Sequence, residues 1–118
     1  MTTVRQLLDA KGRDLWSVSP EDLVIDALRL MAEKNIGALM VLKQGKVVGI
    51  ISERDVVRKV ELSGNSATNT HVEEIMTSDV LRVGPDNTID DCMALMTSKR
   101  IRHLPVYEHE QVIGVISI

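Results

Sequence analysis

The chain has 118 residues, with 14 Lys or Arg against 17 Asp or Glu, so its formal net charge is −3 at pH 7. This length favours one domain, and with 44% apolar residues the chain can bury a core without disulfides or metals. The negative charge and the 2% aromatic content argue against nucleic-acid binding, which needs basic surfaces or stacking platforms. The single cysteine excludes an intrachain disulfide and a cysteine-clustered zinc site, which fits a reducing compartment.

The start of the chain and its apolar runs bear on targeting. Residues 1–5 carry no apolar run of the kind found in a signal peptide. No apolar stretch approaches the ~20 residues that a membrane-spanning helix needs. We therefore expect a cytoplasmic protein with no membrane partner, and the initial Met1 favours a free-standing chain.

The strongest signal in the sequence is an internal repeat. A shift of 65 residues places Val18–Glu53 on Val83–Ile118 without a gap, and 13 of the 36 pairs are identical. About two pairs would match by chance. A second similarity, at a shift of 68, relates residues 4–8 to residues 72–76 and predicts a short lead-in helix before each copy. We therefore expect repeat 1 at residues 1–62, an exposed linker at 63–71 and repeat 2 at 72–118.

An amphipathic helix is predicted in each copy after its proline, Pro20 or Pro85. Apolar residues recur there at the spacing i, i+3, i+4 and i+7, so we expect them in the core. Asp22 and Asn87 precede the two stripes and are the expected N-caps. The stripes are Val24, Ala27, Leu28 and Met31 in repeat 1, and Ile89, Cys92, Met93 and Met96 in repeat 2.

A β-hairpin follows each of these helices. The apolar runs are Ala38–Leu42 and Val47–Ile51 in repeat 1, and His103–Tyr107 and Val112–Ile116 in repeat 2, each pair joined by a polar four-residue turn. Pro105 lacks a backbone donor, which predicts an edge strand or a gap in the ladder that faces a ligand cleft.

A second helix begins after Ser52, with apolar Val56, Val57 and Val60, while repeat 2 stops at Ile118 before its counterpart. The order in each copy is therefore strand, helix, strand, strand, helix, which defines an α/β (α+β) fold. Each half has a core too small to stand alone, so we expect the two repeats to pack about a pseudo-two-fold axis into one compact module. The cleft between them is the expected ligand site.

The segment Ser52-Glu53-Arg54-Asp55 is the most informative local motif. In one interpretation it is a capping box, with Ser52 at the N-cap and Asp55 in the first turn. In the other, the helix N-terminus and Ser52 bind a phosphate, and the two oxygens of Asp55 accept the hydroxyls of a ribose. The two roles are compatible.

The doubled pattern resembles a known family. Pro and a helix are followed by Ile-Gly-Ala-Leu-Met-Val or Ile-Arg-His-Leu-Pro-Val, then by Gly-Ile-Ile-Ser-Glu-Arg-Asp or Gly-Val-Ile-Ser. This ordered set resembles the tandem cystathionine-β-synthase (CBS) domain pair, or Bateman module, of the stand-alone bacterial type. The resemblance implies a regulatory module that binds AMP, ADP, ATP, NAD or S-adenosylmethionine in clefts between the repeats, and that pairs face to face as a homodimer.

The resemblance also implies which residues bind the ligand. Phosphate and ribose would be held by Ser52 and Asp55, and in repeat 2 Ser117 is the matching serine. The adenine would be framed by backbone groups of the segments that enter the second strand, and phosphates would be met by basic side chains. The framing residues are Ile36, Gly37 and Ala38, with Ile101, Arg102 and His103 in repeat 2, and the basic residues are Arg54, Arg102 and His103.

Repeat 2 departs from the pattern, because no Asp follows Ser117 before the chain stops. For His103, phosphate contact and a surface role are equally open. Trp16 either faces a base or packs on the linker. The pair Arg58-Lys59 is expected on a solvated face, and the three histidines, His71 and His109 included, lack metal-ligand spacing.

We therefore predict a sensor of energy or redox state, not an enzyme, that signals through a change of repeat or dimer geometry. It needs no metal or cofactor, and its partners are an adenine nucleotide and a second copy. The alternative is a structural dimerisation module without a physiological ligand, which the missing second Asp favours. An enzyme would need a paired nucleophile and base, and the sequence offers none.

Overall fold

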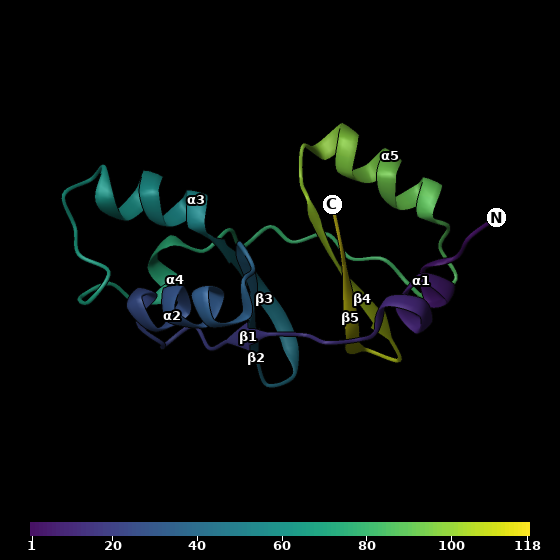
Figure 1. Cartoon of the computed structure of the whole chain (residues 1–118), viewed down its shortest axis with the longest axis horizontal. Coiled ribbons are helices and arrows are strands. Elements are labelled where there is room, and N and C mark those ends of the chain that lie inside the picture. Colours follow the sequence, from purple (N-terminus) through teal and green to yellow (C-terminus); the bar gives the residue numbers. More distant parts are fainter. The chain divides into compact units, whose positions relative to one another are not determined.

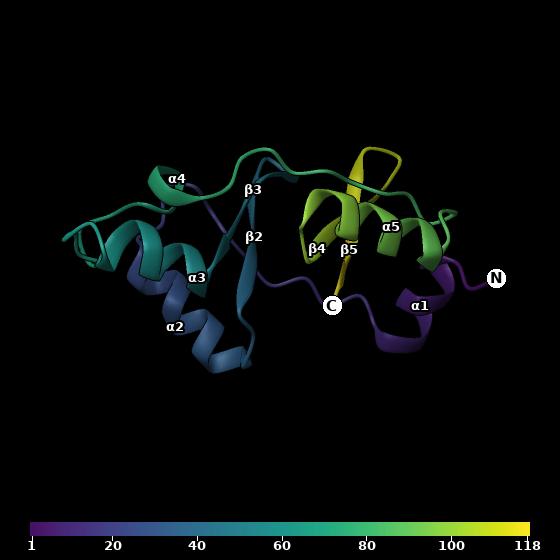
Figure 2. The ribbon, with the colours of Figure 1, turned by 90° about the horizontal axis from the view of Figure 1, so that it is seen from above.

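The computed structural model describes all residues, Met1–Ile118. The chain forms two units, of which one is a continuous stretch of sequence and the other combines the two ends of the chain. The continuous unit consists of Trp16–Val80. The split unit joins Met1–Leu15 to Leu81–Ile118. Each unit is a sheet with helices packed on one face (Figures 1 and 2).

The continuous unit contains a three-stranded sheet in the order β1-β2-β3, with β1 parallel and β3 antiparallel to β2. Its core lies between this sheet and the buried sides of four helical segments, which include Val24, Met31, Val56 and Val72. The strands are β1 (Ser17–Val18), β2 (Ala38–Lys43) and β3 (Lys46–Ser52), and the helical segments are α2 (Val24–Lys34), α3 (Glu53–Val56), the π-helical turn η1 (Val57–Glu61) and α4 (Val72–Ile75).

The split unit repeats this plan with fewer parts. Strands β4 (His103–Glu108) and β5 (Gln111–Ser117) pair antiparallel, and helices α1 (Val4–Lys11) and α5 (Ile89–Lys99) cover them. The two hairpins have the same register, since Ala38 faces Ser52 and His103 faces Ser117. The α+β fold class, with two copies of one element order, is therefore confirmed.

Pro105 explains why the split unit lacks a full counterpart of β1. Val83 forms a single parallel bridge to Val106, donating to the carbonyl of Pro105 at 3.0 Å and accepting from Tyr107 at 2.9 Å. The next bond of this ladder would require an N–H on Pro105, which proline lacks. At the matching position in β2, Met40 has that donor and pairs with Ser17. Pro105 therefore ends the ladder on the outer side of β4.

The two lead-in helices are present, and each docks on the strands of the other repeat. Helix α1 begins repeat 1 but packs in the split unit, while α4 begins repeat 2 but packs in the continuous unit. Three matching backbone hydrogen bonds of 2.8–3.0 Å hold each lead-in helix to the other repeat. The bonds join α1 to the segment that begins at Pro85, and α4 to the segment that begins at Pro20. They run from Val4 to Asn87, Arg5 to Pro85 and Ile89 to Thr2, and from Val72 to Asp22, Glu73 to Pro20 and Val24 to Thr70.

Side chains reinforce the docking of α1. The Arg5 guanidinium donates to Glu108 Oε2 at 2.7 Å, and this hydrogen bond lowers the pKa of the Glu108 carboxyl. The segment before α4 is not wholly exposed, since Ala67 and Thr70 are buried and the Ala67 carbonyl accepts from Ile25. These contacts bring α4 back onto the sheet of repeat 1.

Two glycines at matching positions make room for the exchanged helices. A Cβ on Gly49 in β3 would lie 2.5 Å from Sδ of Met76, directly after α4. A Cβ on Gly114 in β5 would lie 2.9 Å from Cδ2 of Leu8 in α1. The identical Gly49/Gly114 pair is therefore required by close approach of a helix to the sheet.

The expected N-caps were wrong. Helix α5 is capped by Thr88 in a capping box with Asp91, and α2 begins after Leu23 without a side-chain cap. Asp22 and Asn87 instead accept, each at 2.8 Å, from the backbone N–H of Ser19 and Gly84 in the preceding turn. Because the side-chain oxygens of Asp22 and Asn87 accept hydrogen bonds within these turns, they do not cap the helices, and each helix starts one residue later than expected.

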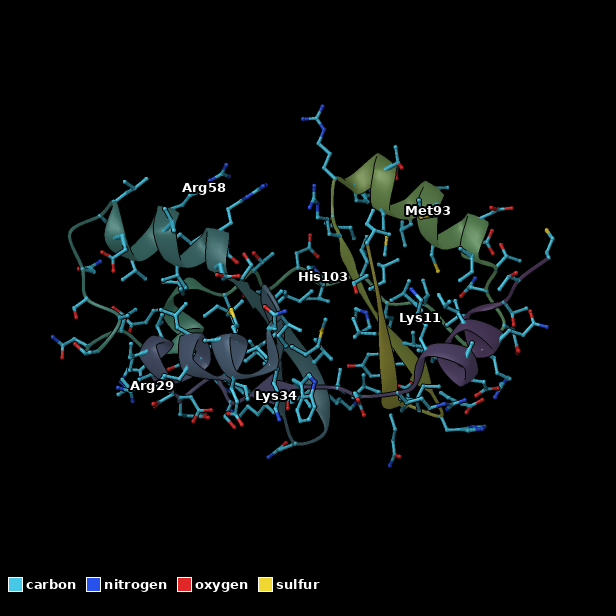
Figure 3. The ribbon with its side chains drawn as sticks, in the orientation of Figure 1. Lys11, Arg29, Lys34, Arg58, Met93 and His103 are labelled. Atoms are coloured by element: carbon cyan, nitrogen blue, oxygen red, sulfur yellow. The ribbon has the colours of Figure 1, made fainter.

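One expected core residue, Met93, lies at the surface, and so does the apolar Val57. Met93 is 43% exposed (Figure 3). The buried side of α5 is formed by Cys92 and Met96, and the side chain of Met93, which follows Cys92 in the chain, points away from that side. Val57 is 52% exposed, while Val56 and Val60 on the same segment are buried. The longest helices, α2 and α5, have 11 residues each, and no helix has the length and apolar character needed to cross a bilayer.

The hairpin turns are two residues long, shorter than expected, because the strands extend one residue further at each end. Both central residues have positive φ: Gln44 and Gly45 in one turn, His109 and Glu110 in the other. Glycine adopts this conformation freely, whereas Glu110 at φ 62° is strained.

We expect Glu110→Gly to stabilise the protein by about 0.5–1 kcal/mol, because glycine removes the strain of a left-handed residue. The lost contact to Arg82 at 3.4 Å is exposed and contributes little. Urea unfolding measures the change. The reciprocal variant Gly45→Ala, at φ 78° with open space around the new methyl, should destabilise by a similar amount. A Glu110→Gly protein no more stable than the wild type would contradict the strain argument.

Candidate functional site

The candidate residues of repeat 1 meet where β2 begins and β3 ends. Ala38 faces Ser52 across the hairpin, and the N–H of Glu53 donates to the carbonyl of Gly37 at 3.0 Å. The N–H of Ile36 donates to Met31, at the end of α2, at 3.0 Å. The structure therefore brings the segments 36–38 and 52–55 side by side.

Ser52 and Asp55 form the predicted capping box. The Asp55 N–H donates to Ser52 Oγ at 3.1 Å, and the Ser52 N–H donates to Asp55 Oδ2 at 3.2 Å. The Ser52 hydroxyl also donates to Oδ2 at 3.0 Å. The box closes the start of the helical segment 53–61, and the capping interpretation is confirmed.

Asp55 has acceptor capacity left for a ligand. Its Oδ2 already accepts two hydrogen bonds from Ser52, whereas Oδ1 has one neighbour, the Lys59 ammonium at 3.5 Å. A carboxylate oxygen has two lone pairs, so Oδ1 can accept a hydroxyl beside Lys59. To donate to a phosphate instead, the Ser52 hydroxyl must rotate away from Asp55, at the cost of one hydrogen bond.

The candidate residues of repeat 2 are arranged in the same way in the split unit. His103 faces Ser117, the Ile118 N–H donates to the carbonyl of Arg102 at 3.1 Å, and Ile101 donates to Met96 at 3.0 Å. Burial, and next to it the charge of Arg102, lowers the pKa of His103, so its neutral form is favoured. Ser117 lies beside Arg102 and His103 in this copy, as Ser52 lies beside Gly37 and Ala38 in the other.

The remaining candidates divide into solvated and packed residues. Arg54 is exposed and forms no ion pair. Trp16 is 40% exposed and lies against Lys34, whose ammonium is 4.1 Å from the ring centroid. No group of three His, Cys, Asp or Glu residues is placed to hold a metal ion.

Lys59 is a contact of the site that sequence reasoning missed. It was expected on a solvated face, but its ammonium donates to the carbonyl oxygen of Ile75 at 2.9 Å and lies beside Asp55. The signal available in the sequence was the i, i+4 spacing of Asp55 and Lys59, which places opposite charges on one helix face.

A duplicated strand-helix-hairpin unit, with a serine at the end of each hairpin, defines a class of paired α+β modules. The family model for the CBS domain matches residues 4–62 and 72–118. The chain belongs to the CBS domain family, as a tandem pair.

Known proteins of this family resemble the chain over nearly all its length. A solved CBS-domain protein from Burkholderia ambifaria is 51% identical, with a TM-score of 0.94, over 98% of this chain and 88% of that one. The mitochondrial CBS domain-containing protein CBSX3 of Arabidopsis thaliana is 39% identical over 99% of this chain, which spans 61% of that relative's length. A CBS domain pair solved with 5′-methylthioadenosine and S-adenosyl-L-methionine shares the fold at 24% identity and a TM-score of 0.83, over 99% of this chain and 90% of that one.

Proposed function

We propose that the protein is a regulatory module that binds an adenosine nucleotide beside Ser52 and Asp55. The observation that carries this proposal is the capping box at the end of β3, next to the backbone of residues 36–38, with one carboxylate oxygen still able to accept. CBS pairs act as regulatory modules, and this chain's site contains no nucleophile and base of the kind that catalysis requires.

Each part of a nucleotide has a group of matching chemistry. The Ser52 hydroxyl at the start of the helical segment suits a phosphate, and Arg54 adds a mobile positive charge. Asp55 Oδ1 suits a ribose hydroxyl. Backbone groups of Ile36, Gly37 and Ala38 suit the polar edge of an adenine.

Repeat 2 supports a second, different subsite. Arg102, His103 and Ser117, beside Ile101, provide donors for a phosphate, so this copy suits a phosphate group. The pair solved with two adenosine derivatives adds weight to the ligand class, although its likeness to this chain concerns the fold alone.

Binding should be tested by calorimetry with AMP, ADP, ATP, NAD and S-adenosylmethionine. We expect micromolar affinity for at least one, about −8 kcal/mol. Asp55→Ala should weaken it about tenfold or more, because a charge-assisted hydrogen bond to the ribose is lost. The matched control Asp26→Ala, at an exposed position of α2, should bind as the wild type does. Since Asp55→Ala also removes a cap, Asp55→Asn keeps the shape and separates binding from folding.

An absence of binding by all five ligands would leave the second candidate, a structural dimerisation module. The observation that favours it is the closed capping box, in which Ser52 and Asp55 already bond to each other. For either function we propose a cytoplasmic protein. We also propose a homodimer, because Val57, Leu62 and Met93 are 52%, 77% and 43% exposed on or beside helices, and such apolar side chains are suited to burial against a second copy. Thermal melts with and without nucleotide distinguish the two functions, because only a ligand of the native state raises the midpoint.

A further inference from the structure

Lys59 joins the candidate ligand site to a helix that the sequence assigns to the other repeat. Its Nζ donates to the carbonyl oxygen of Ile75 at 2.9 Å and lies 3.5 Å from Asp55 Oδ1. Ile75 is the last residue of α4, the lead-in helix of repeat 2. The Asp55 side chain is 18% exposed and that of Lys59 46%, so water screens this contact only in part.

The two groups that Lys59 contacts carry the same sign of charge. Asp55 is a carboxylate, and the carbonyl oxygens at the end of α4 carry partial negative charge that no further helical turn satisfies. One ammonium therefore neutralises both. Its neighbour Arg58 projects from the same helical segment and forms no ion pair or hydrogen bond, which makes it a matched comparison (Figure 3).

Helix α4 is otherwise held by backbone contacts, by its apolar side and by the His71 imidazole at its N-cap, which lies 2.9 Å from the Glu21 carbonyl oxygen. Val72 and Glu73 donate to Asp22 and Pro20 at its start. Directly after its end, Thr77 and Ile50 exchange two hydrogen bonds of 2.9 Å, which ties α4 to β3. Since β3 ends at Ser52, the contacts form a closed ring. Its members in order are Ser52, Asp55, Lys59, Ile75, Thr77 and Ile50.

We propose that Lys59 is a positioning residue that couples the Asp55 carboxylate to α4, so that a nucleotide bound at Asp55 is sensed by the lead-in helix of repeat 2. A ribose hydroxyl that donates to Oδ1 shares this oxygen with the Lys59 ammonium and so weakens the attraction between Asp55 and Lys59. Occupancy therefore changes how strongly Lys59 holds Ile75. This ligand step rests on the proposed function, whereas the link between Asp55, Lys59 and α4 does not.

The link is tested first without ligand, by hydrogen exchange at the amides of residues 72–77. Lys59→Met should raise their exchange rates about three- to tenfold, because the end of α4 loses a charge-assisted hydrogen bond. Asp55→Asn should raise them less, and the double variant should exchange no faster than Lys59→Met alone, since both changes remove one connected interaction. Arg58→Met should exchange as the wild type does.

Two results in this arm would overturn the link. One is unchanged exchange at residues 72–77 in Lys59→Met, and the other is a double variant whose effect is the sum of the single effects. A general loss of stability does not imitate the expected result, because it would raise exchange in β2 and β3 as well. Circular dichroism melts of each variant identify that case.

The second arm adds saturating AMP or ATP, whichever binds the wild type. We expect the ligand to change exchange at residues 72–77 in the wild type and in Arg58→Met, and to leave it unchanged in Lys59→Met that has bound the same ligand. An equal response in Lys59→Met would overturn the coupling. If no nucleotide binds the wild type, the proposed function fails and the ligand-free arm alone decides the link.

Discussion

Leu8→Ala should destabilise the protein by about 2–4 kcal/mol and disturb the strands of repeat 2, although Leu8 belongs to repeat 1 in the sequence. Leu8 is 3% exposed and packs with Val106 and Ile116 in the core of the split unit. Truncation removes buried apolar surface and leaves a cavity beside Gly114, where the close approach of helix and sheet allows little relaxation.

Two measurements check this prediction. Urea unfolding gives the loss of stability, and amide chemical shifts show where the change is felt. The shifts should concentrate in β5 around Gly114. Lys11→Ala, on the exposed side of the same helix, is the control and should change stability by less than about 0.5 kcal/mol. Shifts that gather in β3 around Gly49 would mean that α1 packs on its own repeat.

Gly49→Ala should cost about 1–3 kcal/mol, because the new methyl has no space. Its Cβ would lie 2.5 Å from Met76 Sδ, 2.9 Å from Met76 Cγ and 3.0 Å from the Thr77 carbonyl oxygen. The methionine can move in part, but Thr77 is fixed by its two hydrogen bonds to Ile50. The strain therefore falls on the connection between α4 and β3.

A double-mutant cycle isolates this contact. In a Met76→Ala background, Gly49→Ala should cost at least about 1 kcal/mol less than it does in the wild type, since two of its three close neighbours are gone. Gly84→Ala, where the nearest atoms would be 3.8 and 3.9 Å away, is the control and should be neutral or slightly stabilising. Equal costs in both backgrounds would assign the effect to the backbone of β3 rather than to the helix contact.

The sequence predicted the elements well because their signals are local. The alternation of apolar residues in 38–42 and 47–51, and the stripe from Val24 to Met31, each occupy one stretch of chain. The N-caps failed for the same reason: Asp22 and Asn87 have two competing local uses, and the choice of turn over cap depends on how Leu23 and Thr88 pair with residues 71 and 3.

The exchange of the lead-in helices was beyond the reach of sequence reasoning. A repeat makes the two docking surfaces alike, so the apolar side of α1 suits either sheet. The apolar pattern of the lead-in helices indicates that Leu8 and Met76 are buried, but it does not indicate against which strand each side chain packs. Gly49 and Gly114 did indicate close approach, yet their identity in both copies removes any information about which helix approaches which strand.

The site was predicted in part. Ser52 and Asp55 were identified because a capping box is a local motif of four residues. Lys59 was placed with the solvated residues, since its second partner, the carbonyl of Ile75, lies 16 residues away and belongs to no side chain. Every residue has a backbone carbonyl oxygen, so the amino-acid sequence does not indicate which carbonyl at a helix end accepts a side-chain hydrogen bond. The three-dimensional structure is needed to identify such a contact.

The exchange of helices has a consequence for how such a chain arises. Half a chain, with one repeat and one lead-in helix, has a helix that fits the sheet of a second copy. Its own sheet has a docking surface that the helix of that second copy can cover. Two identical short polypeptides would satisfy both needs by swapping segments. Joining them end to end converts an association that depends on concentration into an intramolecular one, and it frees each copy to diverge.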